Sequence, residues 1–229
     1  MKSLVFDAGP IISLAMNNLL SILEQLKRRF NGEFYLPTGV KSEVIDRPLA
    51  SKVFKFEALR VQSLVHNGTF KLIYNNEINS LTNHLLSLTN NSFEAYGNPI
   101  RIIQYGEMQA LASAIFMESE AVVVDERMTR ILIENPRVAA EILKNRLHAP
   151  IKAIQRNIDE FIHHTRKIRV IRSVELVTVA FEMGLLDNYL PQMEDAERQL
   201  LDSVLWAVKL KGCSVSQAEI ERILKLEKV

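Results

Sequence analysis

Residues 1–15, MKSLVFDAGPIISLA, contain the first instance of a pattern that recurs along the chain. Residues 3–6 (SLVF) have the length and apolarity of a buried strand, and Gly9-Pro10 can begin the helix that the following aliphatic residues continue. Asp7 therefore stands where a strand passes into a helix. Its carboxylate has two interpretations, the N-cap of that helix or a ligand, and the stretch alone leaves both open.

The same alternation of short strands and helices continues along the chain. Further strands are predicted at 33–36, 69–74, 121–124 and 167–171. Helices are predicted after Pro37 up to Pro48 and over 51–66, 106–120, 126–145 and 149–165, with two or three more in the tail. Residues 75–98, rich in Asn and Ser, predict a short helix in a loosely held connection. Strands that alternate with helices indicate an α/β fold with a mainly parallel sheet.

Composition excludes several classes of protein. The net charge of +1 over 229 residues excludes a globally basic nucleic-acid binder. A single cysteine, Cys213, excludes an internal disulfide framework and a cysteine-based zinc site, and the five scattered histidines have no zinc-ligand spacing. We identify no signal peptide and no apolar run long enough to span a bilayer. We therefore expect a cytoplasmic protein with no membrane partner.

Asp125 repeats the context of Asp7, because VVV precedes it as LVF precedes Asp7. In a parallel sheet both aspartates would lie at the carboxyl ends of the strands, where ligands bind. Glu107 falls in the first turn of its helix, and Glu43 lies one turn after Val40. Each acid has a simpler explanation as a helix cap, a favourable first-turn charge or a solvated residue. The joint placement of the four acids at one edge of the sheet favours a common binding site.

Four converging carboxylates would repel one another unless a cation were present. An all-oxygen set suits Mg²⁺ or Mn²⁺ and not zinc. Such sites typically activate water and neutralise charge on a scissile phosphodiester.

The motifs resemble those of PIN-domain proteins, the group that includes VapC-like toxins and related prokaryotic ribonucleases. The resemblance is carried by DAGPIISLA at 7–15, LPTGVKSEV at 36–44, GEMQALASA at 106–114 and VVVDERMTR at 122–130, and the tail resembles the closing helices of one branch. It implies a three-layer α/β/α sandwich with extra helices, as one domain over 1–229. About 60 residues between Glu43 and Glu107 depart from the pattern of a compact family member, and we predict insertions at about 48–100 and 135–167.

Carried over residue by residue, the resemblance implies a catalytic and metal-binding set of Asp7, Glu43, Glu107 and Asp125, with Glu126 as an accessory member. It implies a metal-dependent endoribonuclease of toxin-like character, with an antitoxin protein and a homodimer as expected partners. The principal alternative is a non-catalytic protein of the same fold that binds RNA or acts in assembly. A phosphohydrolase acting on small nucleotides is a weaker alternative.

Basic residues concentrate between Arg127 and Arg172, with eleven Lys and Arg against four acids. This excess predicts a phosphate-binding surface, although solvated helix charges explain it as well. The predicted RNA-binding residues are Lys152, Arg156, Arg166, Lys167 and Arg169. Arg127 and Arg130 lie within a turn of Asp125 and are accessory candidates that contact either the phosphate or the acids. His163 and His164 are interpreted as surface residues, not as metal ligands.

Overall fold

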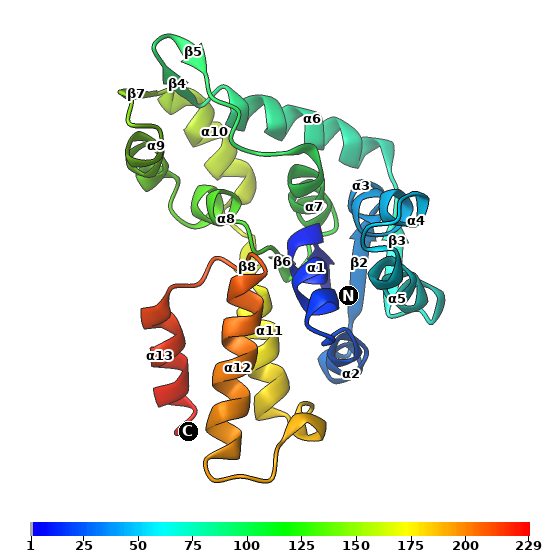
Figure 1. Ribbon diagram of the computed structural model, residues 1–229. Coiled ribbons are helices and arrows are strands. Elements are labelled where there is room, and N and C mark those ends of the chain that lie inside the picture. The colour runs from blue at the N-terminus through cyan, green and yellow to red at the C-terminus, as the bar shows by residue number, and fades with distance from the viewer. Residues whose placement is uncertain (1) are drawn as a thin grey trace.

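The computed structural model describes residues 2–229 (Figure 1). A central sheet of five parallel strands, flanked by helices, forms a three-layer α/β/α sandwich. The strands are β1 (Ser3–Phe6), β2 (Glu33–Pro37), β3 (Phe70–Ile73), β6 (Ala121–Val123) and β8 (Arg169–Ile171). All five predicted strands are therefore confirmed, and so is the predicted fold class.

The strand order β3-β2-β1-β6-β8 places a change of winding direction between β1 and β6. The chain moves outward from β1 through β2 to β3, and then returns to lay β6 against the other side of β1. Phe6 pairs with Val123, so Asp7 and Asp125 leave adjacent strands at the same edge. In open α/β sheets such a switch point forms the crevice in which ligands bind.

Helices cover the sheet because each has an apolar face to bury. One group contacts the strands directly through α7 (Tyr105–Phe116), which packs on β1, β2 and β6. A second group contains α1 (Ala8–Met16), α2 (Ser21–Phe30), α11 (Ser173–Glu182) and α12 (Ala196–Leu210), in which α11 contacts the other three. Figure 1 shows α11 and α12 side by side, with α13 (Gln217–Leu226) next to α12. Ser216 and Glu219 form a capping box at the start of this last helix.

The core between sheet and helices contains a group of phenylalanines from neighbouring strands. The Phe6 ring lies 4.9 Å from the ring of Phe34 and 5.1 Å from that of Phe70, centroid to centroid. All three side chains are fully buried. Aromatic pairs at these separations add to the stability that burial alone supplies.

The helix predicted to close before Pro48 runs on past it. It comprises α3 (Thr38–Lys41), a π-helical turn η1 (Ser42–Asp46) and α4 (Arg47–Ala50). Pro48 follows the π-helical turn directly, as one of the first residues of α4. The next helix, α5 (Lys55–His66), begins four residues later than predicted.

Residues 75–98 are more ordered than predicted. They form the long helix α6 (Asn76–Asn90), β4 (Phe93–Ala95) and the start of β5 (Asn98–Pro99). The Asn75 side chain caps α6 by accepting a hydrogen bond of 2.7 Å from the Glu77 N–H. Ile78 and Leu85 are buried, so the Asn and Ser residues mark the exposed face of a helix and not a loose connection.

The second predicted insertion also has more structure than expected. After α8 (Arg127–Glu134) come the 3-10 turn η2 (Pro136–Val138), α9 (Ala139–Leu147), β7 (Ile151–Ala153) and α10 (Gln155–Thr165). The helix predicted over 149–165 is thus a strand followed by a helix. β7 pairs antiparallel with β4, and α10 contacts α6. One unit is therefore built from α6 and β4 of the first insertion and from α9, β7 and α10 of the second, and it occupies the upper part of Figure 1. Another strand of the first insertion, β3, belongs to the central sheet.

A short 3-10 turn, η3 (Asp187–Tyr189), connects α11 with α12. Over residues 2–229, none of the helices combines the length and apolarity that crossing a membrane requires.

Candidate metal centre and adjoining groove

A pocket of about 260 Å³ lies where the carboxyl ends of β1 and β6 meet. Asp7, Glu43, Glu107 and Asp125, the four acids singled out from the sequence, all line it, and so does Glu126. They come from four separate parts of the chain. The remaining lining residues are Ala8, Gly9, Gln104, Lys211 and Gly212.

Asp7 has both of the roles that its position suggested. As N-cap of α1 it accepts a hydrogen bond from the Gly9 N–H at Oδ2, 3.5 Å away. Its other oxygen, Oδ1, is buried and has no hydrogen-bond partner. Burial raises the pKa of Asp7 to about 7, and the nearby charges of Glu107 and Glu43 add to the rise. A buried carboxylate oxygen without a partner is costly, and a bound cation would satisfy it.

Asp125 is held firmly by its neighbours. Ser173 donates to it twice, from the backbone N–H to Oδ1 and from the hydroxyl to Oδ2, each at 2.7 Å. The Ser13 hydroxyl donates to Oδ2 at 3.2 Å, and the Cys213 thiol is a further partner. Burial raises the pKa of Asp125, while these hydrogen bonds oppose the rise. Sequence reasoning missed all three partners, because they lie far from Asp125 along the chain and no local motif marks them.

Glu107 and Glu126 share a connection through Thr129. The Thr129 hydroxyl donates to Glu107 Oε2 at 3.0 Å, and the Thr129 N–H donates to Glu126 Oε2 at 2.7 Å, which caps α8. Glu107 also belongs to a capping box at the start of α7. Burial raises the pKa of Glu107, with the charge of Glu126 as the next cause. The favourable first-turn role and the pocket role of Glu107 therefore coexist.

Glu43 reaches the pocket from the π-helical turn η1 and lies against Gly106. A Cβ atom at Gly106 would stand 2.6 Å from Glu43 Oε1, which is too close for contact. Glycine is therefore needed at 106 for Glu43 to keep this position. Burial raises the pKa of Glu43, and the charge of Arg47 opposes the rise.

The carboxylates line the pocket without clustering tightly. Within residues 2–229, no three of them offer oxygens that all lie within 4.8 Å of one another. Like-charge repulsion favours such spacing, and a divalent ion would draw the oxygens inward. The five carboxylates of the lining and the unpartnered oxygen of Asp7 fit a hard cation such as Mg²⁺ or Mn²⁺.

A larger groove of about 1090 Å³ adjoins this pocket and shares Gln104, Glu107 and Glu126 with it. Its walls come from α6, residues 99–105, α8 and α9, so the two insertions build most of it. The cationic residues of the lining are Arg101 and Arg146, both exposed. Amide and aromatic side chains also belong to the polar part of the lining, among them Asn83, Asn90, Asn91 and Tyr105.

The basic residues predicted to bind RNA lie elsewhere. Lys152, Arg156, Arg166, Lys167 and Arg169 are all exposed, but none of them lines the pocket or the groove. Lys152 pairs with Glu94 at 3.4 Å. Arg169 pairs with Ala121, and both residues begin their strands. Arg169 therefore lies at the amino ends of the strands, whereas Asp125 lies at the carboxyl ends.

The accessory arginines differ from each other in their surroundings. Arg127 is exposed at the start of α8, whereas Arg130 is partly buried and pairs with Glu134 at 3.6 Å. Arg130 Nε is buried without a hydrogen-bond partner. Neither side chain lines the acidic pocket. The cation that does line it is Lys211, which the sequence interpretation did not single out.

Comparisons with protein-family models, curated proteins and solved structures found no match for this chain. Membership of the PIN-domain family therefore stays a prediction, based on four short motifs in a consistent order. What stands independently of any relative is the geometry: a parallel sheet with five carboxylates around one pocket at its switch point.

Proposed function

We propose that this protein is a PIN-like, metal-dependent endoribonuclease that hydrolyses RNA phosphodiester bonds. The observation that carries the proposal is the buried, unpartnered Oδ1 of Asp7 in a pocket lined by four more carboxylates. Asp7, Glu43, Glu107 and Asp125 would hold one or two Mg²⁺ or Mn²⁺ ions. Bound there, these ions supply an activated water and neutralise charge on the scissile phosphate.

The residues of the chain would contribute mainly by positioning. Ser173 and Ser13 orient Asp125, and Thr129 orients Glu107, as the partners of metal-binding carboxylates commonly do. Lys211 places a cation at the pocket rim, where it can offset phosphate charge. The Cys213 thiol serves no nucleophilic role in this proposal, because burial raises its pKa to about 12.

The adjoining groove supports a nucleic acid as the substrate. It opens onto the acidic pocket through shared residues, and its arginines can neutralise phosphates beyond the cleavage point. Tyr105 is 41% exposed in the groove lining and offers a ring on which a base can stack. We propose that single-stranded RNA lies in this groove, with Arg101 and Arg146 as its first cationic contacts.

The test compares purified wild-type protein with Asp7→Asn and Asp125→Asn. We expect both substitutions to abolish Mg²⁺- or Mn²⁺-dependent cleavage of RNA while circular dichroism shows an unchanged fold. Asp46→Asn is the matched control, because Asp46 is an exposed acid near the site that pairs with Lys41. Cleavage that persists in both site variants would refute the assignment. Single-stranded RNA, structured RNA, single-stranded DNA and a simple phosphate ester, run in parallel, distinguish a nuclease from a phosphohydrolase of small nucleotides.

The second candidate is a non-catalytic protein that uses the same fold to bind RNA or to assemble. The spacing of the carboxylates favours it, because no three of their oxygen ligands converge within residues 2–229. Thermal unfolding with and without Mg²⁺ or Mn²⁺ separates the two proposals, since an ion that binds the native state must stabilise it. A metal-dependent rise in the melting temperature that Asp7→Asn removes supports the enzyme.

A dimer is proposed on a different part of the surface. Four large apolar side chains between residues 53 and 59 are more than half exposed: Val53, Phe54, Phe56 and Leu59. Adjacent exposed apolar side chains are typical of a protein contact. We expect wild-type protein to sediment as a dimer and the Phe56→Ser/Leu59→Ser variant as a monomer; a wild-type monomer would remove the proposal. The expected antitoxin partner rests on the family resemblance alone.

A further inference from the structure

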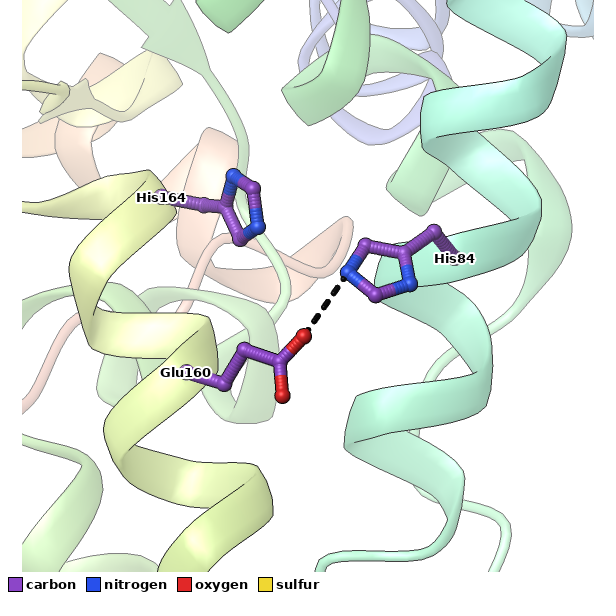
Figure 2. Close-up of side chains that lie close together, drawn as sticks. All are labelled: His84, Glu160 and His164. Carbon is purple, nitrogen blue, oxygen red and sulfur yellow. Dashed lines mark ion pairs between the residues drawn. The ribbon is translucent and has the colours of Figure 1, made fainter.

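Three potential metal ligands converge at the contact between the two insertions. His84 comes from α6, and Glu160 and His164 come from α10 (Figure 2). Each offers one ligand atom, and these atoms all lie within 4.8 Å of one another. Within residues 2–229, this is the one group of three or more histidine, cysteine or carboxylate ligands that meets this distance.

The helices hold these side chains in a suitable arrangement. Glu160 and His164 are four residues apart, so they project from the same face of α10. His84 faces them from α6, with its Nε2 3.1 Å from Glu160 Oε1 (Figure 2). The rings of His84 and His164 are 5.4 Å apart, centroid to centroid. Two ligands one turn apart on a helix, with a third from a facing helix, match the metal sites of helix bundles.

Small movements would complete the site. Ligand atoms around a tetrahedral zinc ion lie roughly 3.4 Å apart, given metal–ligand distances of about 2.0–2.2 Å. The His84 and Glu160 atoms, 3.1 Å apart, are already close to this separation, and the His164 nitrogen lies within 4.8 Å of both. The side chains of His84 and Glu160 are 45% and 40% exposed, which leaves them room to adjust and leaves an ion a path from solvent.

We propose that His84, Glu160 and His164 bind a borderline divalent cation, with Zn²⁺ as the representative ion and water in the fourth position. Two imidazoles and one carboxylate suit Zn²⁺, Co²⁺ or Ni²⁺ and not Mg²⁺, which prefers oxygen ligands throughout. The ion would join α6 to α10 and so fix one insertion against the other. This site does not rest on the proposed nuclease function, and it is separate from the acidic pocket, with which it shares no residue.

An ion that links α6 to α10 would also make the wall of the adjoining groove more rigid. His84 lies in α6 between groove residues, because Asn83, Leu86 and Ser87 of the same helix line the groove wall. Without the ion, the charged contact between the two helices is the pair between His84 and Glu160, and an exposed pair of this kind adds little to the stability that apolar packing supplies. Binding of Zn²⁺ would replace that pair by a three-ligand link between two helices.

The test is calorimetric titration of the full chain with Zn²⁺ alone, together with thermal unfolding. To keep the acidic pocket from contributing, the Asp7→Asn variant serves as the parent. We expect about one Zn²⁺ per chain and a rise in melting temperature, both lost in His84→Gln and in His164→Gln. His66→Gln, which changes an exposed histidine on α5, is the control and should bind as the parent does. Co²⁺ should give visible absorption bands of a low-coordinate site in the parent and not in the two variants.

Two outcomes would overturn the proposal. One is a parent that binds no Zn²⁺ with a dissociation constant below about a millimolar. The other is binding that persists unchanged in both His84→Gln and His164→Gln, which would place the ion elsewhere. Circular dichroism of the variants checks folding, and Glu160→Gln supplies a third variant that removes a ligand without changing either imidazole.

Discussion

Ser173 donates two hydrogen bonds of 2.7 Å to Asp125, and thereby ties the start of α11 to the end of β6. Both residues are buried, at 0% and 2% exposure. The contact lies at the carboxyl edge of the sheet, next to the acidic pocket. It fixes a candidate ligand through an element that begins 48 residues later in the chain.

Replacing Ser173 should therefore lower the stability of the protein and leave the Asp125 carboxylate less firmly positioned. Ser173→Ala removes a hydroxyl that donates to a buried charged group, and we expect the free energy of unfolding to fall by about 1.5–3 kcal/mol. Urea denaturation measures the loss. Thr178→Ala on the same helix removes only a hydroxyl that donates to the Val174 carbonyl, and should cost no more than about 1.5 kcal/mol. Equal losses in both variants would show that the Asp125 contact has no special weight.

Asp7 predicts a dependence of stability on pH when a chelator removes divalent ions. Its pKa in the folded chain is about 7, above the ordinary value of 3.8, so the native state binds the proton more tightly than the unfolded state does. The stability that this proton supplies is complete below pH 3.8 and is lost as the pH rises through 7. Relative to the wild type, the Asp7→Asn variant should therefore become more stable as the pH rises from 5 to 8. The difference in the free energy of unfolding should change by on the order of 2–4 kcal/mol. Urea denaturation at both pH values measures the gain, and Asp46→Asn is the exposed control.

Gly106 should matter for function through Glu43. A methyl group at residue 106 would meet Glu43 Oε1 at 2.6 Å, and the flexible carboxylate can move away at little cost in stability. We expect Gly106→Ala to weaken Mn²⁺ binding about tenfold, which corresponds to about 1.4 kcal/mol, as measured by calorimetry. In the Glu43→Gln background the same change should have almost no further effect, because the displaced group is already altered. Additive losses would show that the methyl group acts elsewhere.

RNA binding can be assigned to one of two surfaces. If the groove holds the substrate, Arg101→Gln and Arg146→Gln should each weaken binding and reduce the slope of log affinity against log salt by about 0.7–0.9. Lys167→Gln and Arg169→Gln, which lie outside the groove, should leave the slope unchanged. Fluorescence anisotropy with single-stranded RNA over a salt series measures both pairs. If Lys167→Gln and Arg169→Gln reduce the slope and the two groove variants do not, RNA binds instead to the basic segment predicted from the sequence.

Much of the central sheet can be predicted from the sequence, because the polarity of neighbouring residues determines where its strands form. Apolar runs such as SLVF and AVVV have the length and apolarity of buried strands. All five strands predicted from the sequence lie in the central sheet. Asn18, between α1 and α2, and Asn31, at the end of α2, adopt positive φ angles, which asparagine tolerates better than most residues do. Asp7 and Asp125 are found at one pocket because parallel strands bring their carboxyl ends to one edge, and Glu43 and Glu107 reach the same pocket from η1 and α7.

The insertions were harder to predict because their structure depends on distant partners. β4, β5 and β7 have two or three residues each, and none has a periodic pattern long enough to indicate a strand. β4 and β7 form because they pair with each other across more than 50 residues of chain. The same separation concealed the histidine cluster, since His84 and His164 come together only when α6 packs on α10.

Polarity and spacing along the chain were enough to predict the five strands of the central sheet, their parallel arrangement and the two aspartates that follow β1 and β6. The tertiary structure alone decided which groups surround those acids. It supplied Ser13, Ser173 and Cys213 to Asp125, left Asp7 Oδ1 without a partner, and placed the groove arginines beside the pocket instead of the more numerous basic residues of 152–169. Hydrogen bonds and burial join residues that are close in space, and closeness in space is fixed only when the elements pack.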